Sequence, residues 1–418
     1  MMRALFAGVS GLRNHLTRMD VIGNNIANVN TVGFKSSRVT FKEAFVQLVS
    51  GASRPGSNLG GTNPVQVGTG VNVGSVDQLF SQGSLETTGN PLDLAIQGDA
   101  FFIMNNGAGN VFTRAGNMQL DADGNLINPG TGYVAQGLVA DPRGSFSGAS
   151  AIGNIRIALS TKAPAQATSE ISLTGNLNHT AKLGDSRDMA IKTYDNAGTP
   201  HELTLRFTNV GPDQWSWSAT CPDAVVSPTG SGQVSFNPSN GSLASFSYPG
   251  GGTGLTLTPG GTGLPYTLTV NAGTLNGLDG LVGFDGDSTA VVNSQNGFQA
   301  GDLENITVDS RGVISGTFTN GKTRPLAQIA LATFNNPGGL VRGSNGMYEI
   351  SPNAGTPVVG FVGGSSRATI TAGALEGSNV DISSEFTNMI ITQRGFQANA
   401  KVVTTADEIL NDLVNMRR

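Results

Sequence analysis

Few residues in this 418-residue sequence could carry chemistry. There are three histidines and one cysteine: His15, His179, His201 and Cys221. No histidine has the spacing of a zinc motif, and the chain has neither the Gly-x-Ser-x-Gly turn of a hydrolase nor a Walker loop. Gly68-Thr69-Gly70 leads toward strand-like residues, which gives little support for a dinucleotide loop. The sequence therefore predicts no catalytic, cofactor or metal site, and His15 is predicted to be a solvated surface residue of an N-terminal helix.

The acidic segment Asp121-Ala122-Asp123-Gly124-Asn125 superficially resembles a calcium-binding loop. In such a loop a glycine takes the sixth position and a bidentate glutamate the twelfth. Here Gly124 comes two positions early, and Gly132 stands where the glutamate belongs. A hairpin turn is therefore favoured, and the similar segment Asp195-Asn196-Ala197-Gly198 is interpreted in the same way.

Two tryptophans and the cysteine lie close together in the middle of the chain. Trp215 and Trp217 are two residues apart on a predicted strand, so their side chains share one face of it. Such a pair could form a platform for a carbohydrate, but packing in a core or an interface is favoured. Cys221 has no second cysteine with which to form a disulfide, and its favoured role is that of a small buried hydrophobic residue.

The composition points to many short strands in several domains. Only 13% of the residues are charged and 59 are glycine, which favours numerous tight turns. A chain of this length is expected to form two to four domains. The net charge of −5 gives no electrostatic reason for nucleic-acid binding. No apolar run approaches the roughly 20 residues that span a bilayer, and the N-terminus lacks the pattern of a cleaved signal peptide, so neither membrane insertion nor a secretory signal is expected.

The first 30 residues predict a helix with an apolar seam and many asparagines. The apolar residues recur at helical spacing, the first five as in a coiled coil: Leu5, Val9, Leu12, Leu16 and Met19, then Val21, Ile22, Ile26 and Val29. Asn24, Asn25 and Asn28 interrupt this pattern, although asparagine is a poor helix former because its amide competes for backbone groups. The helix is expected to end between Asn28 and Gly33, where Asn30 and Gly33 tolerate left-handed backbone.

The last forty or so residues predict a second helix. Asp381 or Ser383 can cap its N-terminus, and Glu385 in the first turn complements the helix dipole. Its apolar stripe consists of Phe386, Met389, Ile390, Phe396, Val403, Leu410 and Val414, widened by Val402, Ala406, Ile409 and Leu413.

Between the helices the sequence alternates like short strands with turns. The predicted fold class is mainly β with long terminal α-helices, in nested domains whose paired helices resemble a coiled coil. The expected domains are a terminal helical domain (1–30 and 376–418), extended connectors (31–75 and 355–375), an inner β domain (76–147 and 301–354) and an outer β domain (148–300) inserted in the inner one.

Both ends of the chain also resemble a known family. MMRALFAGVSGLRNHLTRMDVIGNNIANVNTVGFKSSRVTF resembles the N-terminal signature of bacterial flagellar rod and hook proteins. SNVDISSEFTNMIITQRGFQANAKVVTTADEILNDLVNMRR resembles their C-terminal signature, and GSLETTGNPLDLAIQGDAFFIM and FTRAGNMQLDADGNLINPGTGY look like their shared inner β domain. Together these segments cover well over a third of the chain. The insertion of roughly 150 residues favours a hook-type member over a distal rod member.

The resemblance implies a structural, non-enzymatic subunit without a cofactor. It implies export through the flagellar type III apparatus, and then assembly beneath a hook cap into a homopolymeric curved tube. That tube joins rod to filament, contacts rod and hook–filament junction proteins, and transmits torque as a universal joint. The implied location is the flagellar hook and basal body, at the cell surface or in the periplasm of a spirochaete.

In such a tube, neighbouring copies would cover the weak terminal helices and their asparagines. The residues expected at subunit interfaces are Leu5, Val9, Leu12, Leu16, Met19, Ile22, Asn24, Asn25, Ile26 and Asn28 in the first helix, and Phe386, Met389, Ile390, Phe396, Val403, Ile409, Leu410 and Leu413 in the last. Gly33, Phe34 and Phe41 are expected to anchor the connector. Spirochaete members cross-link a cysteine to a lysine of a neighbouring subunit, which makes Cys221 a candidate for such a link.

Three alternatives stay open at this point. The helices could form a self-contained two-helix core. The protein could be a secreted β-rich adhesin or glycan-binding module with the tryptophans as its platform. An enzyme is the third alternative, and the poor inventory of motifs disfavours it.

Overall fold

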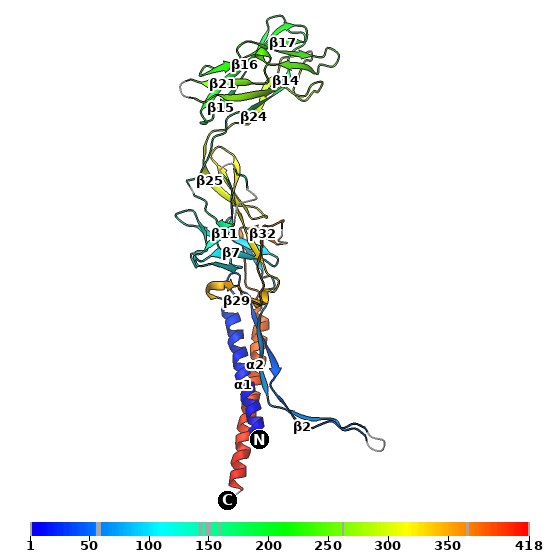
Figure 1. Ribbon diagram of the computed structural model, residues 1–418, viewed down its shortest axis with the longest axis vertical. Coiled ribbons are helices and arrows are strands. Elements are labelled where there is room, and N and C mark those ends of the chain that lie inside the picture. Colours follow the sequence, from blue (N-terminus) through cyan, green and yellow to red (C-terminus); the bar gives the residue numbers. More distant parts are fainter. Residues whose placement is uncertain are drawn as a thin grey trace. The chain divides into compact units, whose positions relative to one another are not determined.

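The computed structural model describes residues 2–55, 60–141, 144–146, 152–158, 160–260, 263–364 and 368–416 (Figure 1). The chain divides into two compact units. Unit 1 comprises Met1–Ala158, Ile306–Ser315 and Pro325–Arg418, and unit 2 comprises Leu159–Asn305 and Gly316–Arg324. The expected mainly β fold with a helix at each end is confirmed. The expected domain boundary between residues 147 and 148 lies outside the described residues.

The two terminal helices of unit 1 are α1 (Met2–Ala27) and α2 (Ile382–Asn415), which pack side by side (Figure 1). Asp381 caps α2, because its carboxylate accepts the backbone N–H groups of Ser383 and Ser384. Helix α1 ends at Ala27, one residue before the expected range of Asn28 to Gly33, and Gly33 turns the chain with a φ of 69°. Asn30 does not adopt the left-handed backbone that was expected of it, since Gly33 alone makes the turn.

Residues 37–50 pair with residues 65–78 as two antiparallel tiers, where the sequence indicated only an extended connector. The lower tier pairs β1 (Ser37–Glu43) with β4 (Val71–Gln78), and the outer tier pairs β2 (Val46–Ser50) with β3 (Val65–Gly68). Contacts of β1 and β4 with α1 hold the lower tier against the helix. We call the outer tier, β2 and β3, the arm.

The β part of unit 1 is built around a mixed aromatic and aliphatic core. Phe101, Phe112, Phe334 and Tyr348 pack together in it, with the rings of Phe112 and Phe334 edge to face at 4.9 Å between centroids. Its strands are β5 (Leu85–Thr87), β6 (Leu94–Gln97), β7 (Phe101–Asn105), β8 (Asn110–Thr113), β9 (Gln119–Leu120), β10 (Leu126–Ile127), β11 (Val134–Val139), β12 (Gly153–Asn154), β28 (Leu331–Thr333), β29 (Val341–Arg342), β30 (Met347–Glu349), β31 (Val358–Gly360), β32 (Thr369–Ala372) and β33 (Ala374–Glu376). Strands β25 (Gly301–Val308), β26 (Val313–Phe318) and β27 (Thr323–Ile329) contribute residues to both units.

Two small sheets of unit 1 join segments from opposite ends of the chain. Strand β6 pairs with β32, and β5 pairs with β33 directly before the segment that leads into α2. The predicted hairpin turn at residues 121–125 is confirmed, because β9 and β10 pair across it. The Asp121 carboxylate accepts hydrogen bonds there from the Asn125 side chain and from the backbone N–H groups of Asp123 and Asn125. These hydrogen bonds, and that of the Asn125 side chain most of all, lower the pKa of Asp121.

Unit 2 consists of two sheets that share one core. One sheet has the order β15-β16-β17-β19-β20, and the other has the order β18-β21-β22-β14-β23 with β24 beside β14. Trp215 and Trp217 are buried in the core, so the expectation that they pack is confirmed. The strands of the two sheets are β14 (Glu170–Asn176), β15 (Ser186–Tyr194), β16 (Pro200–Gly211), β17 (Gln214–Thr220), β18 (Ala224–Ser227), β19 (Gly232–Phe236), β20 (Leu243–Ser247), β21 (Leu255–Pro259), β22 (Tyr266–Asn271), β23 (Leu281–Val282) and β24 (Val291–Gln295). Strand β13 (Lys162–Ala163) lies outside both sheets and pairs with β25.

Two kinds of feature are not found within the described part of the chain. Neither helix there is sufficiently long and apolar to cross a membrane. No group of three or more His, Cys, Asp or Glu side chains in the same residues could hold a metal ion.

Candidate assembly surface

Glycines lie at close contacts between α1 and α2. A Cβ atom placed on Gly11 would lie 2.6 Å from Oδ1 of Asn399, and one placed on Gly8 would lie 3.0 Å from a methyl carbon of Val403. On the other helix, a Cβ atom on Gly395 would lie 2.7 Å from the ring of His15. Close approach of the helices therefore depends on glycine at these three positions, which the apolar pattern did not single out.

Asparagine side chains fasten α1 to its neighbours within the chain. The Asn25 side chain donates to the carbonyl of Ser37 (2.8 Å) and accepts the Ser37 N–H (3.0 Å), so it pairs with the backbone of β1 as another strand would. It also donates to Glu385 at the start of α2 (3.1 Å). Asn14 donates to the carbonyl of Val71 in β4 (2.7 Å). These amides thus hold together three segments that hydrophobic packing alone would not position.

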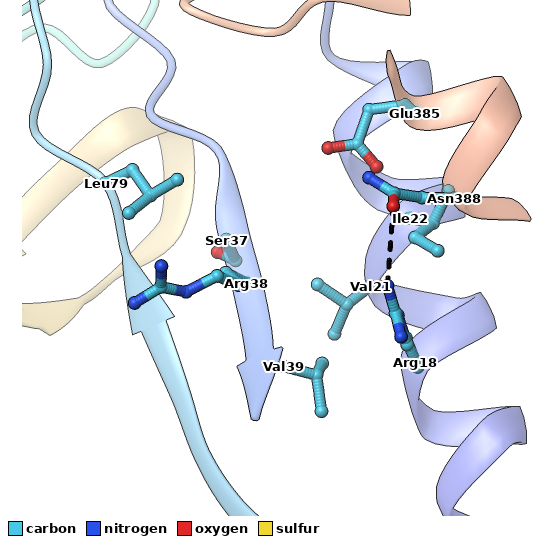
Figure 2. Close-up of a pocket in the computed structure, with 9 residues that line it drawn as sticks. All are labelled: Arg18, Val21, Ile22, Ser37, Arg38, Val39, Leu79, Glu385 and Asn388. Atoms are coloured by element: carbon cyan, nitrogen blue, oxygen red, sulfur yellow. Dashed lines mark hydrogen bonds between the residues drawn. The ribbon is translucent and has the colours of Figure 1, made fainter. Parts of the chain in front are cut away.

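Figure 2 shows the pocket of about 140 Å³ at this junction of α1, α2, β1 and β4. On the helix side of the pocket, Arg18 donates to Oδ1 of Asn388 on α2 (3.4 Å), while Ile22 and Val21 line its apolar wall. The pocket brings charged and apolar side chains of α1, α2 and β1 together.

His15 lies in this helix contact, and the prediction of a solvated His15 was wrong. Its ring packs edge to face against Phe41 of β1 with 5.6 Å between centroids, and it faces Gly395 on α2. Burial, and secondarily the charge of Arg18, lower the pKa of His15. The apolar pattern of the helix did not place His15 in this contact, because the helices meet here at glycines, which an apolar pattern does not detect.

The predicted interface residues fall into three groups in a single copy. The exposed ones are Val9, Leu16, Asn24, Phe386, Ile390, Ile409 and Leu413. The half-buried ones are Leu5, Leu12, Met19, Ile26, Asn28, Met389, Phe396, Val403 and Leu410. Ile22 and Asn25 are covered by the same chain, because β1 and α2 pack over them; they support helix docking in this copy. The role of the other residues between subunits stays a prediction.

The connector residues have distinct surroundings. The Gly33 N–H donates to the carbonyl of Glu376 (2.8 Å), and a Cβ atom there would lie 2.7 Å from the backbone nitrogen of Ala115. Phe34 is buried beneath the guanidinium of Arg342, at 4.5 Å from the ring centroid. Phe41 is borderline exposed and contacts His15. Gly33 and Phe34 therefore anchor the chain to the β part of unit 1, whereas Phe41 contacts α1.

The arm is a second apolar surface, which the sequence did not predict. Every residue of β2 and β3 is exposed, and so is Phe45 just before β2, which is 79% exposed. A two-stranded hairpin is at best marginally stable without a covering layer. Its apolar residues are Phe45, Val46, Leu48, Val49, Val65 and Val67. The sequence signal that could have indicated these two strands is the alternation of valines within a Gly- and Asn-rich segment.

Cys221 is half-buried against the core of unit 2. That setting agrees with the expected small hydrophobic role. Its cross-linking to a neighbouring subunit stays a prediction.

Four family models match the chain in order along its length. "Flagella basal body rod protein" matches residues 5–35, and "Flagellar hook protein FlgE/F/G D1 domain" matches residues 95–177. "Flagellar basal body protein FlaE D2 domain" matches residues 165–298, and "Flagellar basal body rod FlgEFG protein C-terminal" matches residues 371–416. The two terminal matches coincide with α1 and its exit and with α2.

Curated relatives match from end to end. The flagellar hook protein FlgE of Borreliella burgdorferi is 38% identical over 100% of both chains, and that of Treponema pallidum is 36% identical over 100% of both. The flagellar hook protein FlgE of Salmonella typhimurium is 33% identical over 98% of each chain. The crystal structure of Helicobacter pylori flagellar hook protein FlgE2 has a TM-score of 0.51 at 15% identity, covering 70% of this chain and 100% of that one, which supports the fold.

Proposed function

The chain belongs to the flagellar hook protein family, and from this premise we propose that it is a structural subunit of the bacterial flagellar hook. Copies assemble into a curved, flexible tube that joins rod to filament and transmits motor torque. The role is structural and involves no catalysis.

The observation that carries this proposal is the apolar surface that both helices leave uncovered after they pair. Phe6 is 65% exposed, Ile390 is 57% exposed and Val414 is 68% exposed. Long helices draw most of their stability from packing of an apolar face, and exposed apolar patches mark interaction sites. Because α1 and α2 already contact each other through glycines and amides, the larger side chains remain available for other copies.

The C-terminal part of α2 strengthens the argument. Gly8, near the start of α1, lies beside Val403, so the last turns of α2 extend past the beginning of α1 (Figure 1). Residues 411–416 are all exposed, among them Leu413, Val414 and Met416. Every subunit of a homopolymer carries this helix, so a second copy of the chain can cover the exposed C-terminal part of α2. The arm offers such copies a further apolar surface.

The partners and route follow from the same proposal. The chain contacts many copies of itself, the rod and hook–filament junction proteins and the hook cap, and it leaves the cytoplasm through the flagellar type III export apparatus. Its location is the flagellar hook. The distal rod remains the alternative within the family, and unit 2, a second compact unit, favours the hook.

The alternative outside the family is a glycan-binding module. It requires an accessible aromatic platform, but Trp215 and Trp217 are buried in the core of unit 2. This burial disfavours the glycan-binding alternative.

Deletion of residues 1–30 and 380–418 tests the proposal. We expect a soluble, folded β core that no longer forms tubes, because the helices supply the surface that other copies cover. Fluorescence of the buried tryptophans checks the fold, and sedimentation with electron microscopy measures assembly. Tube formation by the truncated chain at the concentration required by the full chain would contradict the proposal.

A further inference from the structure

A buried cluster of three charged side chains joins the two ends of the chain. Nζ of Lys35 lies 2.6 Å from Oε1 of Glu376, and Nη1 of Arg114 lies 3.4 Å from Oε2 of the same carboxylate. The Lys35 and Glu376 side chains are 0% exposed. Glu376 therefore contacts two cations that have no access to water.

Backbone groups complete the cluster. The Gly83 N–H donates to Oε1 of Glu376 (3.0 Å), and Lys35 donates to the carbonyl of Ser81 (2.7 Å). Burial lowers the pKa of Lys35, and the hydrogen bond and charge of Glu376 act against that shift. The ammonium group thus depends on the carboxylate for its favourable surroundings.

The cluster occupies a decisive place in the chain. Lys35 follows α1, and Glu376 is the last residue of β33, shortly before α2. The same two segments are also joined by the Gly33 N–H to the carbonyl of Glu376 (2.8 Å) and by the Ser36 N–H to Oδ1 of Asn379 (2.8 Å). Arg114 belongs to the β part of unit 1, so the cluster also connects that part to the two terminal segments.

The energetic consequence is that neither end can dock well without the other. A buried ion pair is held by its partners, and removal of one partner strands an uncompensated charge, which is strongly destabilising. If residues around 376 are out of place, Lys35 and Arg114 lose their shared anion. If residues around 35 are out of place, Glu376 loses its shortest contact.

We propose that Lys35, Arg114 and Glu376 form a lock that makes docking of the segment leaving α1 conditional on docking of the segment entering α2, and the reverse. The lock lies within one copy, so the inference does not depend on the proposed assembly. Because of the lock, the two helices take their paired positions only when the segment leaving α1 and the segment entering α2 are both docked.

Hydrogen exchange of the full-length monomer with Glu376→Gln tests the lock. This nearly isosteric change removes the anion, so exchange should accelerate at least about tenfold both near residue 376 and across residues 2–43 at the other end. In the reverse test, Lys35→Met should accelerate exchange at residues 370–390, by a smaller factor, because Glu376 keeps Arg114 and the Gly83 N–H.

The matched control is Asp77→Asn, which removes the exposed pair between Arg38 and Asp77, with 3.8 Å between charged atoms. An exposed pair contributes little, so its effect should stay below about twofold. Changes confined to the mutated end in both Glu376→Gln and Lys35→Met would overturn the proposal, as would changes no larger than that of the control. If Glu376→Gln does not fold, Lys35→Met decides: an effect at residues 370–390 supports the lock, and its absence refutes it.

Discussion

Ile390→Glu is expected to abolish self-assembly while leaving the monomer folded. Ile390 is exposed in a single copy, so the change should alter the monomer's free energy of unfolding by no more than about 0.5 kcal/mol. We propose that a neighbouring copy covers this position in the tube, and an unpaired carboxylate buried there would cost several kcal/mol at each contact. The critical concentration for assembly, measured by sedimentation, should therefore rise at least about a hundredfold.

Val225→Glu is the matched control for Ile390→Glu. Val225 is an exposed aliphatic residue of β18 in unit 2, whereas both helices belong to unit 1, so it receives the same charge outside the proposed surface. Its critical concentration should stay near that of the unchanged chain. The account is contradicted if Ile390→Glu assembles normally, or if Val225→Glu is equally damaging.

Leucine substitutions at Gly11 and Gly23 are expected to have opposite effects on α1. Both glycines lie inside the helix, where replacement of glycine by a good helix former gains up to about 1 kcal/mol. At Gly23 a Cβ atom meets open space, so Gly23→Leu should stabilise the helix. At Gly11 the side chain would meet Asn399, whose amide donates to the carbonyl of Gly395 (2.8 Å). Overpacking there costs about 1–3 kcal/mol, and separation of the helices loses further contacts.

Hydrogen exchange of α1 peptides in the monomer measures both substitutions. Gly11→Leu should accelerate exchange and prevent assembly, whereas Gly23→Leu should slow exchange. If both variants stabilise α1, helix propensity alone governs it, and the glycine contact with α2 has no importance.

The position and type of the two helices could be predicted because local signals define them. The apolar repeat, the capping Asp381 and the turn at Gly33 are all encoded within a few residues of where they act. The strands and turns of the β regions follow the same logic. For example, the Asp121 carboxylate organises its hairpin turn through neighbouring N–H groups.

The face on which the helices meet could not be predicted from the apolar pattern. Periodicity locates large hydrophobic side chains, but here Gly8, Gly11 and Gly395 permit the closest contact, while several of the larger residues, such as Val9 and Ile390, stay exposed. The asparagines looked like defects in a helix, yet Asn25 pairs with the backbone of β1, a segment whose position only the tertiary structure defines.

Long-range partners and the arm were likewise beyond sequence reasoning. Lys35 and Glu376 are 341 residues apart, and a single sequence contains no signal that links them. The composition of residues 49–76 resembles a flexible connector, so pairing of β2 with β3 depends on a register that composition does not reveal.

The most direct test of the central claim compares hydrogen exchange of α1 and α2 in the monomer and in the assembled tube. If other copies cover the apolar faces of the helices, amides of both helices should be only partly protected in the monomer and should exchange at least about a hundredfold more slowly after assembly. Helices that are already fully protected in the monomer, or that remain unprotected in the tube, would contradict the account.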